Sequence, residues 1–212
     1  MARRTREEAQ QTRLSIMDTA MTVFARHGLA GASLEQVASE LGLTRGAIYG
    51  HFRSKSELFE QVIKLSRDQI YGMLREAMRH DQPPLEAIRQ FILAWLRMLV
   101  SDRRFRDSFE ILLNKSELTD DLAQLYRDEK RMTQDVIVGL SSIARRAVET
   151  GELPPCVGPE HCGLTVYMHL MGVTQTWLFN PRLFKLSDKT RLIADHLIAS
   201  LALTPNALEL PA

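Results

Sequence analysis

The sequence has little of what a disulfide-rich, membrane-spanning or β-rich protein needs. Its 212 residues include only 2 cysteines, Cys156 and Cys162, so we expect a reducing cytoplasm rather than a disulfide framework. No apolar run approaches the roughly 20 residues that cross a bilayer. The basic start, Met1 to Glu8, is not followed by the apolar stretch of a secretory signal. Hairpin dipeptides such as Asn-Gly and Asp-Gly are absent. We therefore expect a soluble, all-α protein in the cytoplasm, with no membrane contact.

The formal net charge of only +1 conceals an uneven distribution. Residues 1–67 hold ten Lys or Arg and seven Asp or Glu, whereas the remaining residues hold seventeen and nineteen. This modest bias agrees with nucleic-acid binding by the N-terminal part of the chain.

Apolar residues recur at steps of three and four along nearly the whole chain, which is typical of helices packed on a core. The expected helices, about nine, start near 7, 33, 44, 54, 85, 104, 118, 160 and 188. We expect Gly28 to stop the first of them. The predicted domains are a three-helix DNA-binding domain at 1–53, a helical ligand-binding and dimerisation domain at 54–204, and a tail at 205–212.

Residues 33–59 have the pattern of two short helices joined by a glycine. Ser33 and Gln36 form a capping box for the first of these helices, and Thr44 is a good cap for the second. Gly42 between them tolerates the positive φ that a tight turn needs. A further capping box, Ser54 with Glu57, opens the next helix. This arrangement predicts a helix-turn-helix, whose second helix enters the major groove of DNA. The structural alternative is a three-helix packing unit with no role in DNA binding.

The outward face of the second of these helices carries side chains suited to DNA. An arginine such as Arg45 can donate two bonds to a guanine edge, and Thr44 at the helix start suits a phosphate. Lys55 could bind a backbone phosphate, and the Arg3-Arg4 arm could enter a minor groove or be a solvated terminus. The expected DNA contacts are Arg3, Arg4, Ser33, Thr44, Arg45, Gly46, Ala47, Tyr49, His51 and Lys55.

The same segment resembles the N-terminal signature of TetR-family repressors, through the run Leu41-Gly42-Leu43-Thr44-Arg45-Gly46-Ala47-Ile48-Tyr49 and then His51-Phe52. Residues 1–13, 110–120 and 177–181 resemble the AcrR-type branch, which controls multidrug efflux operons. The resemblance implies a homodimeric repressor that binds a two-fold operator and is released by a small hydrophobic or amphipathic inducer. Position 50 is often a large aromatic residue in this branch, whereas this chain has Gly50. Because glycine costs about 1 kcal/mol in a helix interior, we expect this helix to fray near its end.

The C-terminal part supplies candidates for an apolar cavity with a few polar groups, since methionine and aromatic side chains repack around varied ligands. The ordinary alternative is a packed core. Glu129 interrupts an apolar stripe, so it should face solvent, pair with a cation such as Arg67, or meet a ligand. The expected ligand-binding residues are Ile63, Arg67, Phe91, Trp95, Phe109, Leu113, Glu129, Met132, Val136, Tyr167, Leu170, Met171 and Thr174.

We expect the last two helices to form the dimer interface. Gly163 and Gly172 would permit close approach there, next to the apolar residues Leu192, Ile193, Leu197, Ile198 and Leu201. The resemblance implies a four-helix bundle made by both subunits.

Other classes of function find less support in the sequence. Cys156, His161, Cys162 and His169 fit no standard zinc spacing, so we expect neither an enzyme nor a metal or other cofactor. The alternatives that stay open are a repressor sensing an endogenous lipid or signalling molecule, one sensing oxidation through the two cysteines, and an architectural DNA binder without a ligand.

Overall fold

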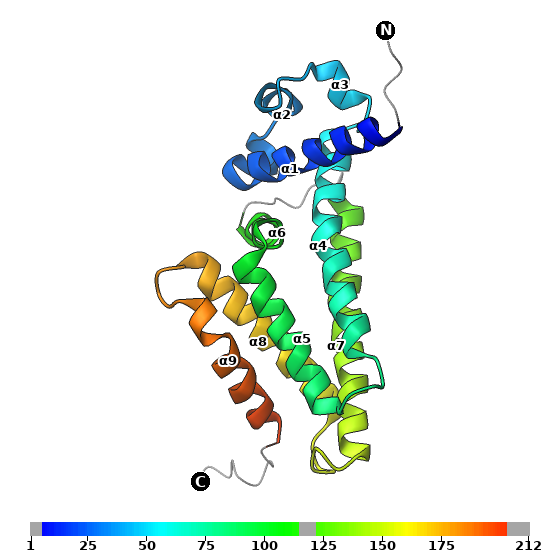
Figure 1. The fold of residues 1–212 in the computed structure, drawn as a ribbon, viewed down its shortest axis with the longest axis vertical. Coiled ribbons are helices and arrows are strands. Elements are labelled where there is room, and N and C mark those ends of the chain that lie inside the picture. The colour runs from blue at the N-terminus through cyan, green and yellow to red at the C-terminus, as the bar shows by residue number, and fades with distance from the viewer. Residues whose placement is uncertain (1–5, 115–121, 203–212) are drawn as a thin grey trace. The chain divides into compact units, whose positions relative to one another are not determined.

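The computed structural model describes residues 6–114 and 122–202, and these ranges contain nine α-helices and no strand. Figure 1 shows their course along the chain. The helices are α1 (Arg6–Gly31), α2 (Leu34–Glu40), α3 (Arg45–Tyr49), α4 (Lys55–Ala77), α5 (Pro84–Ser101), α6 (Arg103–Asn114), α7 (Ala123–Glu149), α8 (Pro159–Phe179) and α9 (Leu186–Leu201). The predicted all-α class is confirmed.

The predicted capping and turn chemistry forms the start of the chain. In α2, the Ser33 hydroxyl oxygen accepts from the Gln36 N–H at 3.2 Å, and the Gln36 side chain accepts from the Ser33 N–H at 2.7 Å. The turn into α3 passes through Gly42 at a φ of 63°, a conformation that disfavours residues with a Cβ. At Gly28, with φ 68° and ψ 175°, α1 kinks and then continues for one more turn. The predicted stop is therefore a break within the helix.

Helix α3 ends earlier than expected, and this changes the role of Gly50. Gly50 is the C-terminal cap of α3, with φ −68° and ψ −18°. Its N–H donates to the Gly46 carbonyl at 3.1 Å, and the His51 N–H donates to the Ile48 carbonyl at 2.9 Å. The placement of Gly50 in a helix interior was wrong, because a cap residue does not carry the interior penalty of glycine.

The contacts group the chain into two units, one made of residues 1–67 with 103–127 and the other of 68–102 with 128–212. Helices α4 and α7 each run from one unit into the other. Nothing in this grouping tests the predicted domain limits at 53/54 and 204/205, which stay predictions.

The first unit has a core built from α1 to α4 together with parts of α6 and α7. Phe24 of α1 meets Phe59 of α4 edge-to-face, with ring centroids 5.1 Å apart. Ile48 of α3 is fully buried in the same core, as are Val37 of α2 and Ile111 of α6. The inward anchor Ile48 fixes which face of α3 points outward.

In the second unit, α5 packs against α8 and α9. Helix α8 also lies very close to α7 at Gly163. A Cβ built there would be 2.2 Å from the Ser141 hydroxyl oxygen and 2.6 Å from the Ile137 carbonyl oxygen. Gly163 therefore permits a contact inside the chain and does not belong to a dimer face, which corrects the prediction.

Two leucines of the predicted dimer face are also used inside the chain. Leu197 and Leu201 are 3% and 5% exposed, because α9 turns them toward its own unit. Leu192 is 46% exposed, and around Gly172 the space where a Cβ would lie is open. These two positions remain available to a partner.

Candidate DNA-binding face and ligand-binding cluster

The outward face of α3 is built by one cap and one buried anchor. The Thr44 hydroxyl oxygen accepts from the Ala47 N–H at 3.2 Å and starts the helix. With Ile48 buried, Thr44, Arg45, Gly46 and Tyr49 are exposed. Ala47 and His51 are half-buried beside them. The structure thus brings six of the predicted DNA contacts to one end of the first unit.

Arg45 is held in place by two neighbours. Its Nε lies 2.8 Å from the Glu35 carboxylate of α2, and its guanidinium donates to the Tyr49 hydroxyl at 3.1 Å. The guanidinium carbon also lies 5.3 Å from the Tyr49 ring centroid. The hydrogen bond that Arg45 donates to Tyr49, and after it the charge of Glu35, raise the pKa of Arg45 further above its ordinary value. Arg45 is therefore a fully charged, oriented donor on the exposed face.

Two predicted DNA contacts have other roles inside the first unit. Ser33 is the cap of α2, as described above. The Lys55 ammonium donates to the carbonyls of Leu29 and Ala32 at 2.7 and 3.0 Å, which ties α4 to the chain after the Gly28 kink. Only one of its three N–H donors is then left for a phosphate. Its contact with DNA stays a prediction. Arg3 and Arg4 lie outside the described residues.

Arg13 supports the recognition helix, and sequence reasoning missed it. Its guanidinium donates to the His51 carbonyl at 3.0 Å and to the Gln61 side chain at 3.3 Å. The same group lies over the Phe52 ring, 4.2 Å from its centroid. Arg13 therefore ties α1 to the end of α3 and to α4. No spacing signal marks it, since these partners lie 38 to 48 residues away.

Several predicted ligand-binding residues meet in the second unit as a cluster of aromatic and polar side chains. The buried Trp95 ring donates its N–H to the Thr174 hydroxyl at 3.0 Å and lies edge-to-face with the Tyr167 ring at 6.5 Å. The Tyr167 and Thr133 hydroxyls are 2.9 Å apart. The Phe91 ring lies tilted by 51° against the Trp95 ring, with the centroids 6.2 Å apart. We call these five residues the Trp95 cluster, which joins α5, α7 and α8.

Tyr167 shows the electrostatic character of the Trp95 cluster. Burial raises the pKa of its hydroxyl above the ordinary 10.0, the Thr133 bond opposes this, and the carboxylate of Glu129 raises the pKa further. Glu129 is half-buried. The cluster is therefore mostly apolar, with an acidic group close by.

The other predicted ligand-binding residues divide between the two units. Met132, Val136, Leu170 and Met171 belong to the second unit, and the first three of these are buried. Ile63, Arg67, Phe109 and Leu113 belong to the first unit. A pairing of Arg67 with Glu129 and a cavity shared by all these residues therefore stay predictions.

The two cysteines differ in environment. Cys156 is exposed and Cys162 is buried, and both are free thiols. Burial raises the pKa of the Cys162 thiol, which lowers its thiolate fraction and disfavours a role in redox sensing. Across the described ranges, no group of three or more His, Cys, Asp or Glu is placed to hold a metal ion. No helix within those ranges combines the length and the apolar character needed to cross a membrane.

Comparison with known families matches both parts of the chain. The profile described as bacterial regulatory proteins of the tetR family matches residues 16–62. The profile of the MAATS-type transcriptional repressor C-terminal region matches residues 83–203.

Individual proteins match over most of their length. The regulator AcrR of Shigella flexneri is 30% identical over 90% of this chain and 89% of its own. The regulator TtgR of Pseudomonas putida is 33% identical over 85% of this chain and 87% of its own. The crystal structure of NalD matches this chain with a TM-score of 0.76 and 26% sequence identity, over 92% of this chain and 96% of NalD. NalD is the secondary repressor of the MexAB-OprM multidrug efflux pump in Pseudomonas aeruginosa. With both profiles and these relatives in agreement, the chain belongs to the TetR family of bacterial transcriptional regulators.

Proposed function

We propose that this chain is a ligand-responsive repressor that controls a multidrug efflux operon and acts in the cytoplasm as a homodimer. The observation that carries the proposal is the exposed face of α3, where Arg45 is oriented by Glu35 and Tyr49. A charged arginine on a helix of this kind suits the major groove of a two-fold operator. The named relatives control transcription, and NalD represses an efflux pump.

An exposed apolar surface supports the dimer. On α8, Leu164 and Met168 are 42% and 60% exposed, and they lie on one face of the helix. A hollow of about 450 Å³ beside them is lined by Met168, Gly172, Val173 and Phe184, among others. Contiguous apolar surface of this kind is typical of protein interfaces. We infer that a second copy of the chain covers it.

The Trp95 cluster is the proposed inducer site. It is apolar and aromatic, its polar groups are few, and the Glu129 carboxylate is near enough to affect Tyr167. Such a site suits a planar hydrophobic cation, because a carboxylate attracts the charge and aromatic rings stack on it. An acyl chain with an anionic head would be disfavoured by the same carboxylate.

A continuous helix offers a physical link between the inducer site and the DNA-binding unit. On α7, Leu125 is buried in the first unit's core, whereas Thr133 bonds to Tyr167 in the second unit. On α4, Phe59 lies in the first core and Tyr71 donates to the Asp135 carboxylate of α7 at 2.7 Å. An inducer that moves α7 therefore acts on helices that also build the DNA-binding unit, which is the coupling a repressor needs.

The test measures operator binding and its reversal. Fluorescence anisotropy is followed with labelled DNA from the promoter of the chain's own gene and of its neighbours. Arg45→Gln should weaken binding at least about tenfold, since a bidentate contact to guanine is lost, whereas Arg131→Gln, at an exposed site on α7, should not. Equal binding by both variants would reject the DNA-binding role of Arg45.

The inducer class is tested on the same complex. Ethidium, a planar cation, should release the DNA, and Glu129→Gln should weaken that release. Palmitoyl-CoA represents the alternative class of endogenous lipids. Release by palmitoyl-CoA alone, unaffected by Glu129→Gln, would replace the efflux proposal by lipid sensing.

A further inference from the structure

Helices α5 and α9 are joined by complementary charges at one place. The Arg89 guanidinium of α5 lies 2.8 Å from the Asp195 carboxylate of α9. Farther along, the two helices line a shared groove with Arg97, Val100 and Ser101 of α5 and Ser187, Asp188, Thr190 and Arg191 of α9. Residue numbers therefore rise along one helix while they fall along the other, so the two helices are antiparallel. Asp195 and Arg191 are one turn apart on α9.

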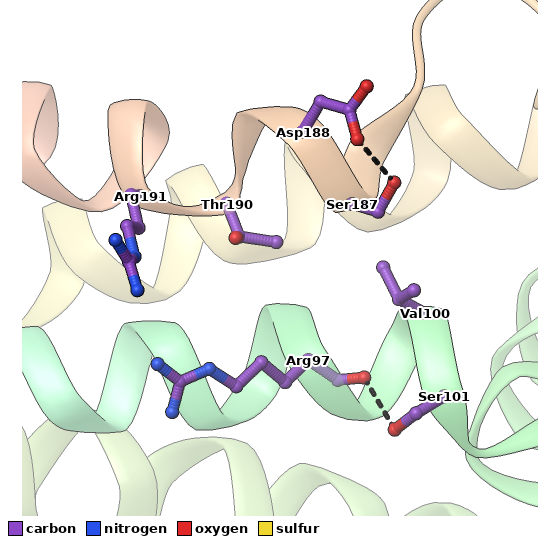
Figure 2. Close-up of a pocket in the computed structure, with 7 residues that line it drawn as sticks. All are labelled: Arg97, Val100, Ser101, Ser187, Asp188, Thr190 and Arg191. Atoms are coloured by element: carbon purple, nitrogen blue, oxygen red, sulfur yellow. Dashed lines mark hydrogen bonds between the residues drawn. The ribbon is translucent and has the colours of Figure 1, made fainter.

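Farther along the pair, an arginine of α5 faces an arginine of α9. Arg97 and Arg191 line one groove of about 580 Å³, which we call the α5–α9 groove. Figure 2 shows both guanidinium groups at the same end of it. Both side chains are exposed. Within residues 6–114 and 122–202, neither guanidinium has an ion-pair or hydrogen-bond partner. Two like charges on packed helices repel each other, and neither is directly paired within the described chain.

The remaining polar groups of the groove are compatible with an anion. Hydroxyl groups of Ser101, Ser187 and Thr190 line the groove. Ser101 donates to the Arg97 carbonyl at 2.8 Å and Ser187 donates to Asp188, so the Thr190 hydroxyl is the one that no described hydrogen bond engages. The one carboxylate, Asp188, is already engaged, since it accepts from Ser187 at 2.9 Å and lies 3.2 Å from the Lys185 ammonium. In Figure 2 this carboxylate points away from α5. The lining residues of the groove therefore carry two positive charges against one negative charge that is already paired.

We propose that the α5–α9 groove binds a small organic oxyanion, a carboxylate or a phosphate, carried on a short apolar body. Two guanidinium groups from different helices can chelate the oxygens of such a head group. Val100 supplies an apolar wall, and the volume lies in the range of small-molecule sites. This site is distinct from the Trp95 cluster and goes beyond the proposed function.

An occupied groove would act on the helix that lines the inducer site. Arg97 and Trp95 are two residues apart on α5, so they project from widely separated faces of one helix. An anion that bridges Arg97 and Arg191 replaces repulsion between α5 and α9 by attraction. The bound anion therefore holds α5 against α9 while the inducer occupies the opposite face of α5.

The test is isothermal titration calorimetry on the full chain with two anions, phenyl phosphate and octanoate, and with neutral 1-octanol as reference. The double variant Arg97→Gln, Arg191→Gln should bind the preferred anion at least about tenfold more weakly, since charged hydrogen bonds are lost. The matched control is Arg131→Gln on α7, which leaves the groove intact. Binding by the wild type should also weaken with added NaCl, because exposed charges are screened.

The two anions separate the possible head groups. Tighter binding of phenyl phosphate identifies a phosphate ligand, and tighter binding of octanoate identifies a carboxylate. Equal affinity of the wild type and the double variant for both anions would overturn the proposal, as would no binding of either anion to the wild type at millimolar concentration. If the double variant does not fold, Arg191→Gln alone provides the same comparison. Operator binding without anion is measured in parallel and should not change, so a failure of the groove proposal leaves the repressor proposal untouched.

Discussion

Replacing Gly163 by alanine adds one methyl group to α8 and should affect the stability of the fold in two opposite ways. Alanine in a helix interior is favoured over glycine by about 1 kcal/mol. At Gly163, however, the new Cβ would be 2.2 Å from the Ser141 hydroxyl oxygen and 2.6 Å from the Ile137 carbonyl oxygen. Since heavy atoms in contact prefer separations near about 3.5 Å, α8 has to move away from α7 by about 1 Å. Overpacking of this kind costs about 1–3 kcal/mol.

A matched alanine variant isolates the packing cost. Gly72 lies inside α4, and its new Cβ would meet only the end of the Arg75 side chain, at 3.8 Å. Gly72→Ala should therefore gain the helix preference without a clash. The difference in free energy of unfolding between the two variants is then the overpacking cost of about 1–3 kcal/mol.

The assay is urea unfolding followed by circular dichroism, at one fixed protein concentration because a dimer's stability depends on concentration. The free energy of unfolding should be higher for Gly72→Ala than for the wild type. For Gly163→Ala it should be lower than for Gly72→Ala by at least about 1 kcal/mol. If both alanine variants are stabilised equally, α8 does not pack on α7 as described, and the reasoning fails.

Three further predictions concern function and pH. Glu35→Gln should raise operator affinity about two- to fivefold, because it removes a negative charge near the phosphates while the Tyr49 hydroxyl still orients Arg45; Glu40→Gln is the control, and equal effects in anisotropy titrations would contradict the idea. Met168→Glu should give monomers in analytical ultracentrifugation, since a charge enters the proposed dimer face, whereas Val138→Glu, at a side chain of α7 that is 59% exposed, should stay dimeric. Burial raises the pKa of Tyr167 above its ordinary 10.0, so the stability linked to its neutral form is fully present below that value and is lost as pH rises through the folded pKa. Tyr167→Phe should reduce the loss of stability between about pH 8 and pH 11 in urea titrations; an unchanged alkaline loss would exclude this linkage.

Local chemistry made the N-terminal part predictable. A cap, its partner three residues on, and a glycine at positive φ act over a few residues, so Ser33, Gln36 and Gly42 could be assigned from spacing alone. The recurrence of apolar residues at steps of three and four likewise predicted the helices of the second unit. The spacing does not show what each apolar helix face packs against. Leu197 and Leu201 share the apolar face of α9, but a face that packs inside the chain and one that packs on a second copy have the same pattern.

Long-range polar contacts could not be predicted from the sequence for a related reason. Lys55 could be expected near DNA because it follows the recognition helix, yet its ammonium donates to the carbonyls of Ala32 and Leu29, 23 and 26 residues away. These carbonyls lie at the C-terminal end of α1 and just after it, where backbone carbonyls lack helical partners. Thr174 could be proposed for a cavity from its place in an apolar helix, but not as the acceptor for Trp95, 79 residues away. In both cases the sequence supplies a donor and a type of acceptor, and only the packing of helices decides which acceptor is close. Buried polar groups must find partners, so each such contact also restricts how those helices can pack. The bond between Trp95 and Thr174 fixes α5 against α8 in the region where an inducer is proposed to bind, and an inducer that takes either polar group must loosen that contact.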